Sequence, residues 1–400
     1  MNLTRRELIR RMGLLVAGSG MAGGELPAAV IGVAGRRGPL AVAGTGEDPG
    51  EPAGSIPLIH VTDLYDPPQD PDDQIDLATV VALEEYDVLG VVLDITEKFL
   101  HARPEGWDIA RKPGFESVAG MARITGRTIP VAQGPHRPLS HPGDTCENAP
   151  EDEQAGIRMI LRLLEASRDP VTISVTGSPR ALIAAYNREP ALLREKILAV
   201  LLNAGSTGGS KVEWNVQLDP RAYVGLWRSD LPIRWYPPGT DSGAFDAADE
   251  RGTYYRARQA DLFRDLPVPL QGYFADVLAG SVPGGQGVTG DDSRWRAILS
   301  QERNLWSTAS LVMGAGRVLA ETEEGWRFLP ARGPESDEVW PWRLDRIRAS
   351  VDDEGRVDWA VVEHDTGRWI FGRRPGRGFG PAMTEALNAL LRDMKVRKLP

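Results

Sequence analysis

Cysteine is nearly absent from this chain of 400 residues, and Cys146 is the only one. No disulfide can therefore form within the chain. An excess of positive charge is also lacking, because the formal net charge is −10, and this argues against a general nucleic-acid-binding protein. No internal repeat is visible. Hydrophobic residues make up 42% of the chain, enough for a sizeable core, and the length suggests one large domain or one domain with additions.

The N-terminus lacks an apolar run of the ~20 residues that a membrane-spanning helix needs. The run from Met12 to Gly24 is short and rich in glycine. It follows Thr4-Arg5-Arg6-Glu7-Leu8-Ile9-Arg10, which resembles the twin-arginine export motif. We therefore predict a signal peptide at 1–33, a flexible linker at 34–55 that is rich in Gly, Ala and Pro, and no stable membrane anchor. The alternative is a basic amphipathic helix of the mature protein.

From Ile56 onward, apolar runs typical of buried strands alternate with segments of helical spacing. This alternation predicts an α/β fold with a mostly parallel sheet and helices on both faces, over a main domain at 56–330. The tail at 346–374 alternates apolar and polar residues and predicts a small antiparallel meander. A last helix is expected at about 381–394, so that 331–400 forms a C-terminal extension packed on the main domain. Strands are predicted at 56–63, 86–94, 128–134, 170–178 and 196–205, and helices at 73–86, 114–127, 152–169 and 179–188.

Polar residues and glycines follow each of the five predicted strands of the main domain. Functional loops of a parallel sheet lie beyond the carboxyl ends of its strands, so we expect the site there. The residues, in chain order, are Asp63, Asp94, Gly134, Thr176-Gly177 and Asn203.

Five aspartates crowd the loop after the first strand: Asp63, Asp66, Asp70, Asp72 and Asp73. They cannot all be ionised close together without a compensating cation. Carboxylate and carbonyl oxygens are the ligands that Ca²⁺ prefers, and the start of the following helix adds a positive dipole end. The loop therefore predicts a metal site. Helix capping by Asp72 is the alternative, and it accounts for one or two of the five aspartates.

This loop resembles the D-T-D-P-G-x-D-D signature of the nucleoside hydrolases, the inosine-uridine preferring family. Thr62-Asp63 and Asp72-Asp73 match its ends, while Val61 stands in place of the first aspartate and several residues are inserted between. Glu213-Trp214-Asn215 and Asp219-Pro220 resemble the family's E-F-N and D-P elements. The segment from Val171 to Gly205 resembles its strand, G-P-L-T-N loop, helix and following strand. The likeness covers about 56–318 in the same order and identifies the chain as a divergent member.

The resemblance implies a bound Ca²⁺ that holds a ribose and the attacking water. Asp63 and Asp73 would be metal ligands, together with the backbone carbonyl at Arg180, and Asp63 would also be the general base. The remaining matched residues would contact substrate: Asp72, Asp94, Glu213 and Asn215 through sugar hydroxyls, and Trp214 and Trp306 by stacking on a base or sugar.

The match departs from the family at its late His-Asp pair, where Trp306-Ser307 stands by order and by the apolar helix that follows. His364-Asp365 is rejected as the counterpart, because Asp-Thr-Gly is ordinary turn chemistry and predicts a hairpin turn. A third metal carboxylate and an acid for the leaving group are therefore lacking. Asp66, Asp70 or Asp292 could compensate for the carboxylate, and His136 is a candidate acid.

These observations predict an exported, metal-dependent hydrolase that cleaves the N-glycosidic bond of a riboside or related glycoside. A non-catalytic, Ca²⁺-dependent nucleoside- or sugar-binding protein on the same scaffold is the alternative. The expected partners are a small riboside or sugar and the twin-arginine export machinery, with a periplasmic or extracellular location and homo-oligomerisation left open. The glycine-rich stretch from Ala279 to Asp292 predicts a long loop that could act as a lid.

Overall fold

The computed structural model describes residues 55–68, 71–102, 109–208, 212–240, 249–281, 283, 292–331 and 338–397. The predicted signal peptide, nearly all of the predicted linker, Asp70 and most of the predicted lid loop lie outside these residues. None of the described helices is both long enough and apolar enough to cross a membrane.

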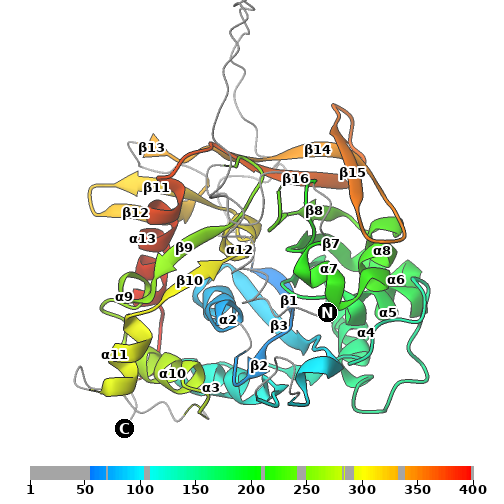
Figure 1. Cartoon of the computed structure of the whole chain (residues 1–400). Coiled ribbons are helices and arrows are strands. Elements are labelled where there is room, and N and C mark those ends of the chain that lie inside the picture. Colours follow the sequence, from blue (N-terminus) through cyan, green and yellow to red (C-terminus); the bar gives the residue numbers. More distant parts are fainter. Residues whose placement is uncertain are drawn as a thin grey trace, which may run out of the picture.

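The central sheet has nine strands, and its inner strands are apolar runs such as Val171–Val175 and Ile197–Leu202 (Figure 1). Its strand order is β15-β14-β16-β8-β7-β6-β1-β3-β5. From β16 to β5 each strand is parallel to the next one in this order, whereas β14 is antiparallel to both β15 and β16. The predicted mostly parallel sheet is therefore confirmed. The strands are β1 (Ile56–Thr62), β3 (Tyr86–Leu93), β5 (Val131–Gln133), β6 (Val171–Val175), β7 (Ile197–Leu202), β8 (Ile233–Trp235), β14 (Trp342–Val351), β15 (Val357–Val361) and β16 (Arg368–Arg373).

Helices cover both faces of the sheet, and each face has its own apolar core. Side chains alternate across a strand, so in β1 Leu58 enters one core while Ile59 enters the other. The first core receives α2 (Asp72–Ala82), α3 (Phe115–Thr125), α10 (Val268–Leu278), α12 (Thr308–Gly314) and α13 (Phe379–Arg392). The second receives α4 (Ala155–Ala166), α5 (Arg180–Arg188), α6 (Pro190–Lys196) and α8 (Pro220–Arg228). All eleven residues of α2 are buried, as its nearly all-round apolar sequence predicts.

Smaller elements complete the described chain. Two short antiparallel pairs and a three-stranded sheet stand apart from the central sheet. They are β2 (Tyr65–Asp66) with β4 (Lys112–Pro113), β9 (Tyr255–Arg258) with β10 (Glu302–Leu305), and β11 (Arg317–Thr322) with β12 (Gly325–Pro330) and β13 (Glu338–Val339). The short helices are η1 (Glu97–Phe99), α7 (Trp214–Leu218), α9 (Gln259–Leu262) and α11 (Ser293–Leu299).

The C-terminal strands extend the central sheet, and their order corrects the predicted meander. β14 lies between β15 and β16, so β15 and β16 are not hydrogen-bonded to each other. The reason is that β16 also pairs in parallel with β8, at Arg368–Ile233 and Ile370–Trp235. Figure 1 shows these strands at one end of the sheet, beside β8. The last helix, α13, packs back on α2 and β12.

Candidate functional site

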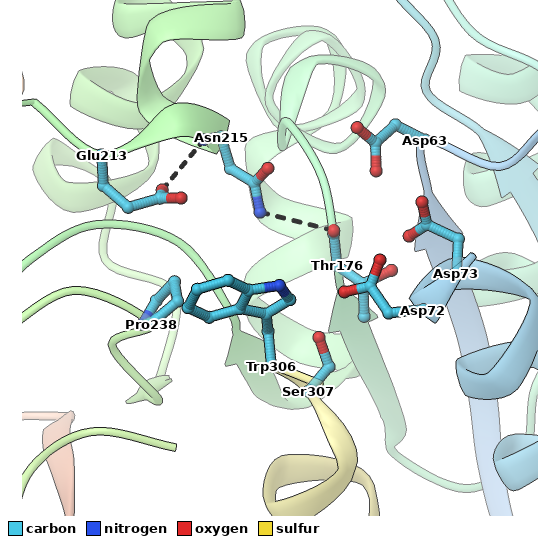
Figure 2. A pocket seen from close by; sticks show the side chains of 9 residues that line it. All are labelled: Asp63, Asp72, Asp73, Thr176, Glu213, Asn215, Pro238, Trp306 and Ser307. Carbon is cyan, nitrogen blue, oxygen red and sulfur yellow. Dashed lines mark hydrogen bonds between the residues drawn. The ribbon is translucent and has the colours of Figure 1, made fainter. Parts of the chain in front are cut away.

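A small polar pocket opens beyond the carboxyl ends of the parallel strands. Segments far apart in the sequence supply its walls, as expected for the carboxyl edge of such a sheet. Figure 2 shows three aspartates gathered at one side of the pocket, facing Asn215, with the Trp306 ring lying across it. The lining residues are Asp63, Asp72, Asp73, Thr176, Glu213, Asn215, Pro238, Trp306 and Ser307.

Asp63 follows β1 directly and is only 5% exposed. Its neighbour across the sheet is Gly177, which follows β6. A Cβ atom added at Gly177 would lie 2.9 Å from Asp63 Oδ1 and 3.0 Å from Asp63 Cβ. Glycine at this position therefore gives the carboxylate the room it occupies.

Asp72 and Asp73 are the first two residues of α2 and are 5% and 7% exposed. The helix is preceded by Pro71 at its N-cap, and no side chain caps it there. The capping alternative for Asp72 is therefore not what the structure shows. Both carboxylates instead stand in the first turn, where the positive end of the helix dipole favours negative charge.

Glu213 and Asn215 form the wall opposite the aspartates. Glu213 Oε2 accepts hydrogen bonds from the backbone N–H of Asn215 and of Gly205, both at 3.0 Å. Asn215 Nδ2 donates to the backbone oxygen of Asn203 at 3.0 Å and to that of Thr176 at 3.4 Å (Figure 2). These bonds fix the side chains to the loops that follow β6 and β7, so the wall is held in place before any ligand arrives.

Trp306 and Ser307 line the remaining side and come from the segment between β10 and α12. The Trp306 ring contacts Tyr254 with centroids 4.8 Å apart. Thr176 is one of the strand-end residues that the sequence places at this edge of the sheet, whereas Pro238 was not among the expected site residues. Pro238 follows β8, another parallel strand, so its position after a strand end is the signal that could have found it.

Asp94 and Arg180 do not line the pocket, which corrects their expected positions. Arg180 is fully buried: its Nε lies 3.0 Å from Asp219 Oδ2, and its Nη1 donates to the backbone oxygens of Ile95 and Pro135. Asp94 Oδ2 accepts from the backbone N–H of Ala181 at 2.6 Å, and its Oδ1 is 3.8 Å from Arg180 Nη1.

The backbone carbonyl of Arg180 also belongs to the first turn of α5, where carbonyls accept the helix's own N–H groups. Thr176, four residues earlier, is the residue of this loop that lines the pocket. The structure therefore places Thr176, and not Arg180, of this loop at the pocket.

Trp214, another predicted contact, lies beside the pocket without lining it. It is 8% exposed, and its ring packs 6.2 Å from Phe99 and under the ammonium of Lys98 at 4.8 Å. Trp214 therefore belongs to an aromatic cluster with Phe99, whereas its two sequence neighbours, Glu213 and Asn215, line the pocket.

The residues considered as substitutes for the missing acid or carboxylate lie elsewhere. Asp66 accepts from the Ser117 hydroxyl, Asp292 caps α11, and His136 Nδ1 is 3.6 Å from Glu153. Burial lowers the pKa of His136, and the negative charge of Glu153, the next-largest influence, raises it. His364 and Asp365 are exposed in the connection between β15 and β16, and neither lines the pocket. The predicted hairpin turn is wrong, because β15 and β16 both pair with β14 and not with each other.

The pocket carries four carboxylates and no basic side chain among its described lining residues. Thr176 Oγ1 is buried there and has no hydrogen-bond partner. Such an all-oxygen donor set fits a hard cation such as Ca²⁺. Within the described residues, however, no three His, Cys, Asp or Glu side chains stand ready-made as a metal-ligand group.

Comparison with known sequences gives two partial relatives, while no protein-family profile matches the chain. The pyrimidine-specific ribonucleoside hydrolase RihA of Enterobacter sp. (strain 638) is 28% identical over 140 residues, 30% of this chain and 44% of the relative. RihA of Citrobacter koseri is 26% identical over 191 residues, 42% of this chain and 57% of the relative. The chain thus spans about half the length of the curated relatives it matches.

Comparison with solved structures gives the plant nucleoside hydrolase PpNRh1, with a TM-score of 0.50 at 14% identity. The superposition covers 86% of this chain and all of that one. The chain therefore has an α/β, nucleoside hydrolase-like fold, as the sequence predicts.

Proposed function

We propose that this protein is a hydrolase that cleaves the N-glycosidic bond of a riboside or a closely related glycoside. The observation that carries the proposal is the meeting of Asp63, Asp72 and Asp73 with Glu213 and Asn215 around one pocket. These residues come from segments that resemble nucleoside hydrolase motifs, on a fold of that type. The partial RihA relatives support a ribonucleoside as the substrate.

The chemistry follows from the charge of the pocket. Breaking an N-glycosidic bond passes through a state in which the sugar ring carries positive charge. Nearby carboxylates stabilise that charge, and no basic side chain among the described lining residues opposes them. Glu213 and Asn215 offer oxygen atoms to sugar hydroxyls, and their own bonds to the strand-end loops hold them in place. The sugar is thereby oriented toward the aspartates.

Asp63 is proposed as the general base that takes the proton of the attacking water. Its carboxylate stands at the end of β1, and Gly177 leaves it no spare room on one side. Asp72 is proposed to bind a ribose hydroxyl. The proton leaves the water as the new C–O bond forms, so the product is the free sugar.

Metal dependence belongs to the same proposal. Asp63, Asp73 and an oxygen atom of Thr176 would hold Ca²⁺, because all three line the pocket and supply the oxygen ligands that it prefers. When bound, Ca²⁺ supplies positive charge that orients hydroxyl groups and makes nearby water easier to deprotonate. We also propose export by a twin-arginine route, on the basis of the motif at Thr4–Arg10.

The test is a turnover screen of the purified protein with uridine, cytidine, inosine, adenosine and 4-nitrophenyl riboside, with added Ca²⁺ or with EGTA. Release of base or nitrophenol should require the cation. Asp63→Asn should lower kcat by about 10²–10⁴-fold with an unchanged circular dichroism spectrum, because it removes the base. Asp169→Asn, at an exposed position, serves as the matched control and should behave as the wild type.

A non-catalytic, Ca²⁺-dependent nucleoside- or sugar-binding protein is the second candidate. It is favoured by one observation: among the described residues that line the pocket, none is an evident acid for the leaving group. Calorimetry with the same ribosides distinguishes the two. Tight binding with no turnover of any substrate would assign the protein to the binding class.

A further inference from the structure

The proposed reaction needs a proton at the departing base, and the pocket lining does not offer an obvious source. A nucleobase leaves with the electron pair of the broken bond, so an acid that protonates it lowers the barrier. Carboxylates, hydroxyls, an amide, an indole and a proline make up the described lining. An acid has to reach in from beside the pocket.

Lys98 lies at a suitable place in the fold. It belongs to η1, which follows β3 at the same carboxyl edge of the sheet as Asp63. Its Nζ atom is 4.8 Å from the centroid of the Trp214 ring and 5.4 Å from that of Phe99. Trp214 stands in the chain between Glu213 and Asn215, which both line the pocket, and the charge of Asp63 acts on the Lys98 ammonium.

The ammonium of Lys98 is half-buried, and it has neither a hydrogen bond nor an ion pair with any described residue. Loss of hydration makes such a position costly for a charge, and the aromatic faces compensate only partly. Burial accordingly lowers the pKa of Lys98, and Arg180 lowers it further, while Asp63 raises it. The three N–H groups of the ammonium therefore remain available to a ligand.

We propose that Lys98 Nζ is the proton donor to the departing base, a role that rests on the proposed riboside hydrolysis. The glycosidic C–N bond breaks, and its electron pair goes to the base nitrogen together with a proton from Lys98. Water adds to the anomeric carbon and gives its proton to Asp63. Transfer of that proton from Asp63 through solvent to the neutral amine of Lys98 restores both groups, so the sum is riboside plus water to ribose plus free base.

The placement has an electrostatic advantage. A second permanent cation, beside the proposed Ca²⁺, would add to the repulsion of the positive charge that develops on the ring. Lys98 loses its charge in the same step, because it hands the proton to the base. A lysine whose pKa is lowered toward the working pH is also a better acid than an exposed one.

The experiment compares two leaving groups in the full-length protein. Uridine needs protonation of its base, whereas 4-nitrophenyl riboside releases a stable anion and does not. Lys98→Met keeps the apolar stem on Trp214 but has no proton to donate. We expect it to lower kcat/KM for uridine by about 10²–10⁴-fold and to change 4-nitrophenyl riboside cleavage less than fivefold. Lys112→Met, at an exposed lysine of β4, is the control.

Lys98→Arg separates proton donation from charge. A guanidinium keeps the positive charge but does not release its proton, so this variant should lose uridine cleavage as Lys98→Met does. Recovery of uridine cleavage in Lys98→Arg would overturn the inference in favour of simple charge. Equal losses on both substrates in Lys98→Met would overturn it as well, as would a wild type that cleaves only the aryl riboside. A wild type that cleaves neither substrate would instead refute the proposed function, and the inference with it.

Discussion

At the scale of single residues, Gly177 controls the position of Asp63. An alanine there would bring its methyl group within 2.9 Å of Asp63 Oδ1, closer than such atoms approach. We predict that Gly177→Ala displaces the carboxylate and lowers kcat by about 10²-fold, since small misplacements of catalytic groups cost that much. Steady-state kinetics on the substrate found in the screen measure this.

The matched control is Gly143→Ala, because a methyl group at Gly143 meets nothing closer than 3.4 Å. This variant should keep wild-type kinetics. If Gly177→Ala retained full activity in a folded protein, the position of Asp63 would not matter for the reaction, and its role as the base would be lost.

Asp94 gives a prediction on pH. Burial raises the pKa of its carboxyl from 3.8 to about 7, while Arg180 and the Ala181 N–H act in the opposite direction. The folded protein therefore binds this proton more tightly than the unfolded chain does. The stabilisation from Asp94 is complete below pH 3.8 and is lost as the pH rises through about 7.

Urea unfolding between pH 5 and pH 8.5 measures this effect. The wild type should lose free energy of unfolding across that range relative to Asp94→Asn, whose amide can still accept from Ala181 N–H but cannot titrate. Parallel pH profiles for the two proteins would show that Asp94 is ionised throughout the range, contrary to the prediction.

Several site residues could be predicted from the sequence because they stand in short local motifs at strand ends. Asp63, Asp72, Asp73, Glu213, Asn215 and Trp306 all line the pocket. Arg180 and Asp94 could not be placed in this way. Inside the protein Arg180 binds Asp219, which is remote in sequence, and Asp94 accepts from the Ala181 N–H and lies near the Arg180 guanidinium. A buried ion pair of this kind leaves no periodic trace along the chain.

At the scale of elements, the loop and helix after β1 carry the proposed cation site. If Ca²⁺ binds only the folded state, chelation with EGTA should lower Tm, because ligand binding stabilises the state it binds. Asp73→Ala should abolish this response, since it removes one proposed ligand. Asp169→Ala should retain it. Differential scanning fluorimetry measures the shifts. A wild-type Tm that does not respond to chelation, with no metal found by elemental analysis, would contradict calcium binding.

The order of elements was predictable where strands and helices alternate along the chain, because the spacing of apolar residues and the turn residues between them predict each strand and each helix. β1, β3, β5, β6 and β7 lie where the apolar runs predict them. The C-terminal arrangement was not predictable in this way. A local pattern predicts pairing between strands that are neighbours in the chain. β16 instead pairs with β8, and the paired residues Arg368 and Ile233 are 135 positions apart.

At the scale of the whole molecule, one sheet unites the two predicted regions, 56–330 and 331–400. We predict that a chain ending after Trp340 is insoluble or aggregated, because removal of β16 exposes the edge of β8 and part of both cores. A chain ending at Arg397 is the control. Soluble yield and light scattering measure the difference. A soluble, cooperatively unfolding protein from the shorter chain would show that the extension is dispensable.

The pairing of β8 with β16 also has a consequence during protein synthesis. A ribosome adds about 5–20 residues per second, so β8 leaves the exit tunnel roughly ten seconds before β16 does. Throughout that interval the growing chain carries an open sheet edge with unpaired N–H and C=O groups. The nascent protein therefore depends on either a bound chaperone or rapid elongation until its last strand arrives, and slow codons between β8 and β16 should increase its aggregation in the cell.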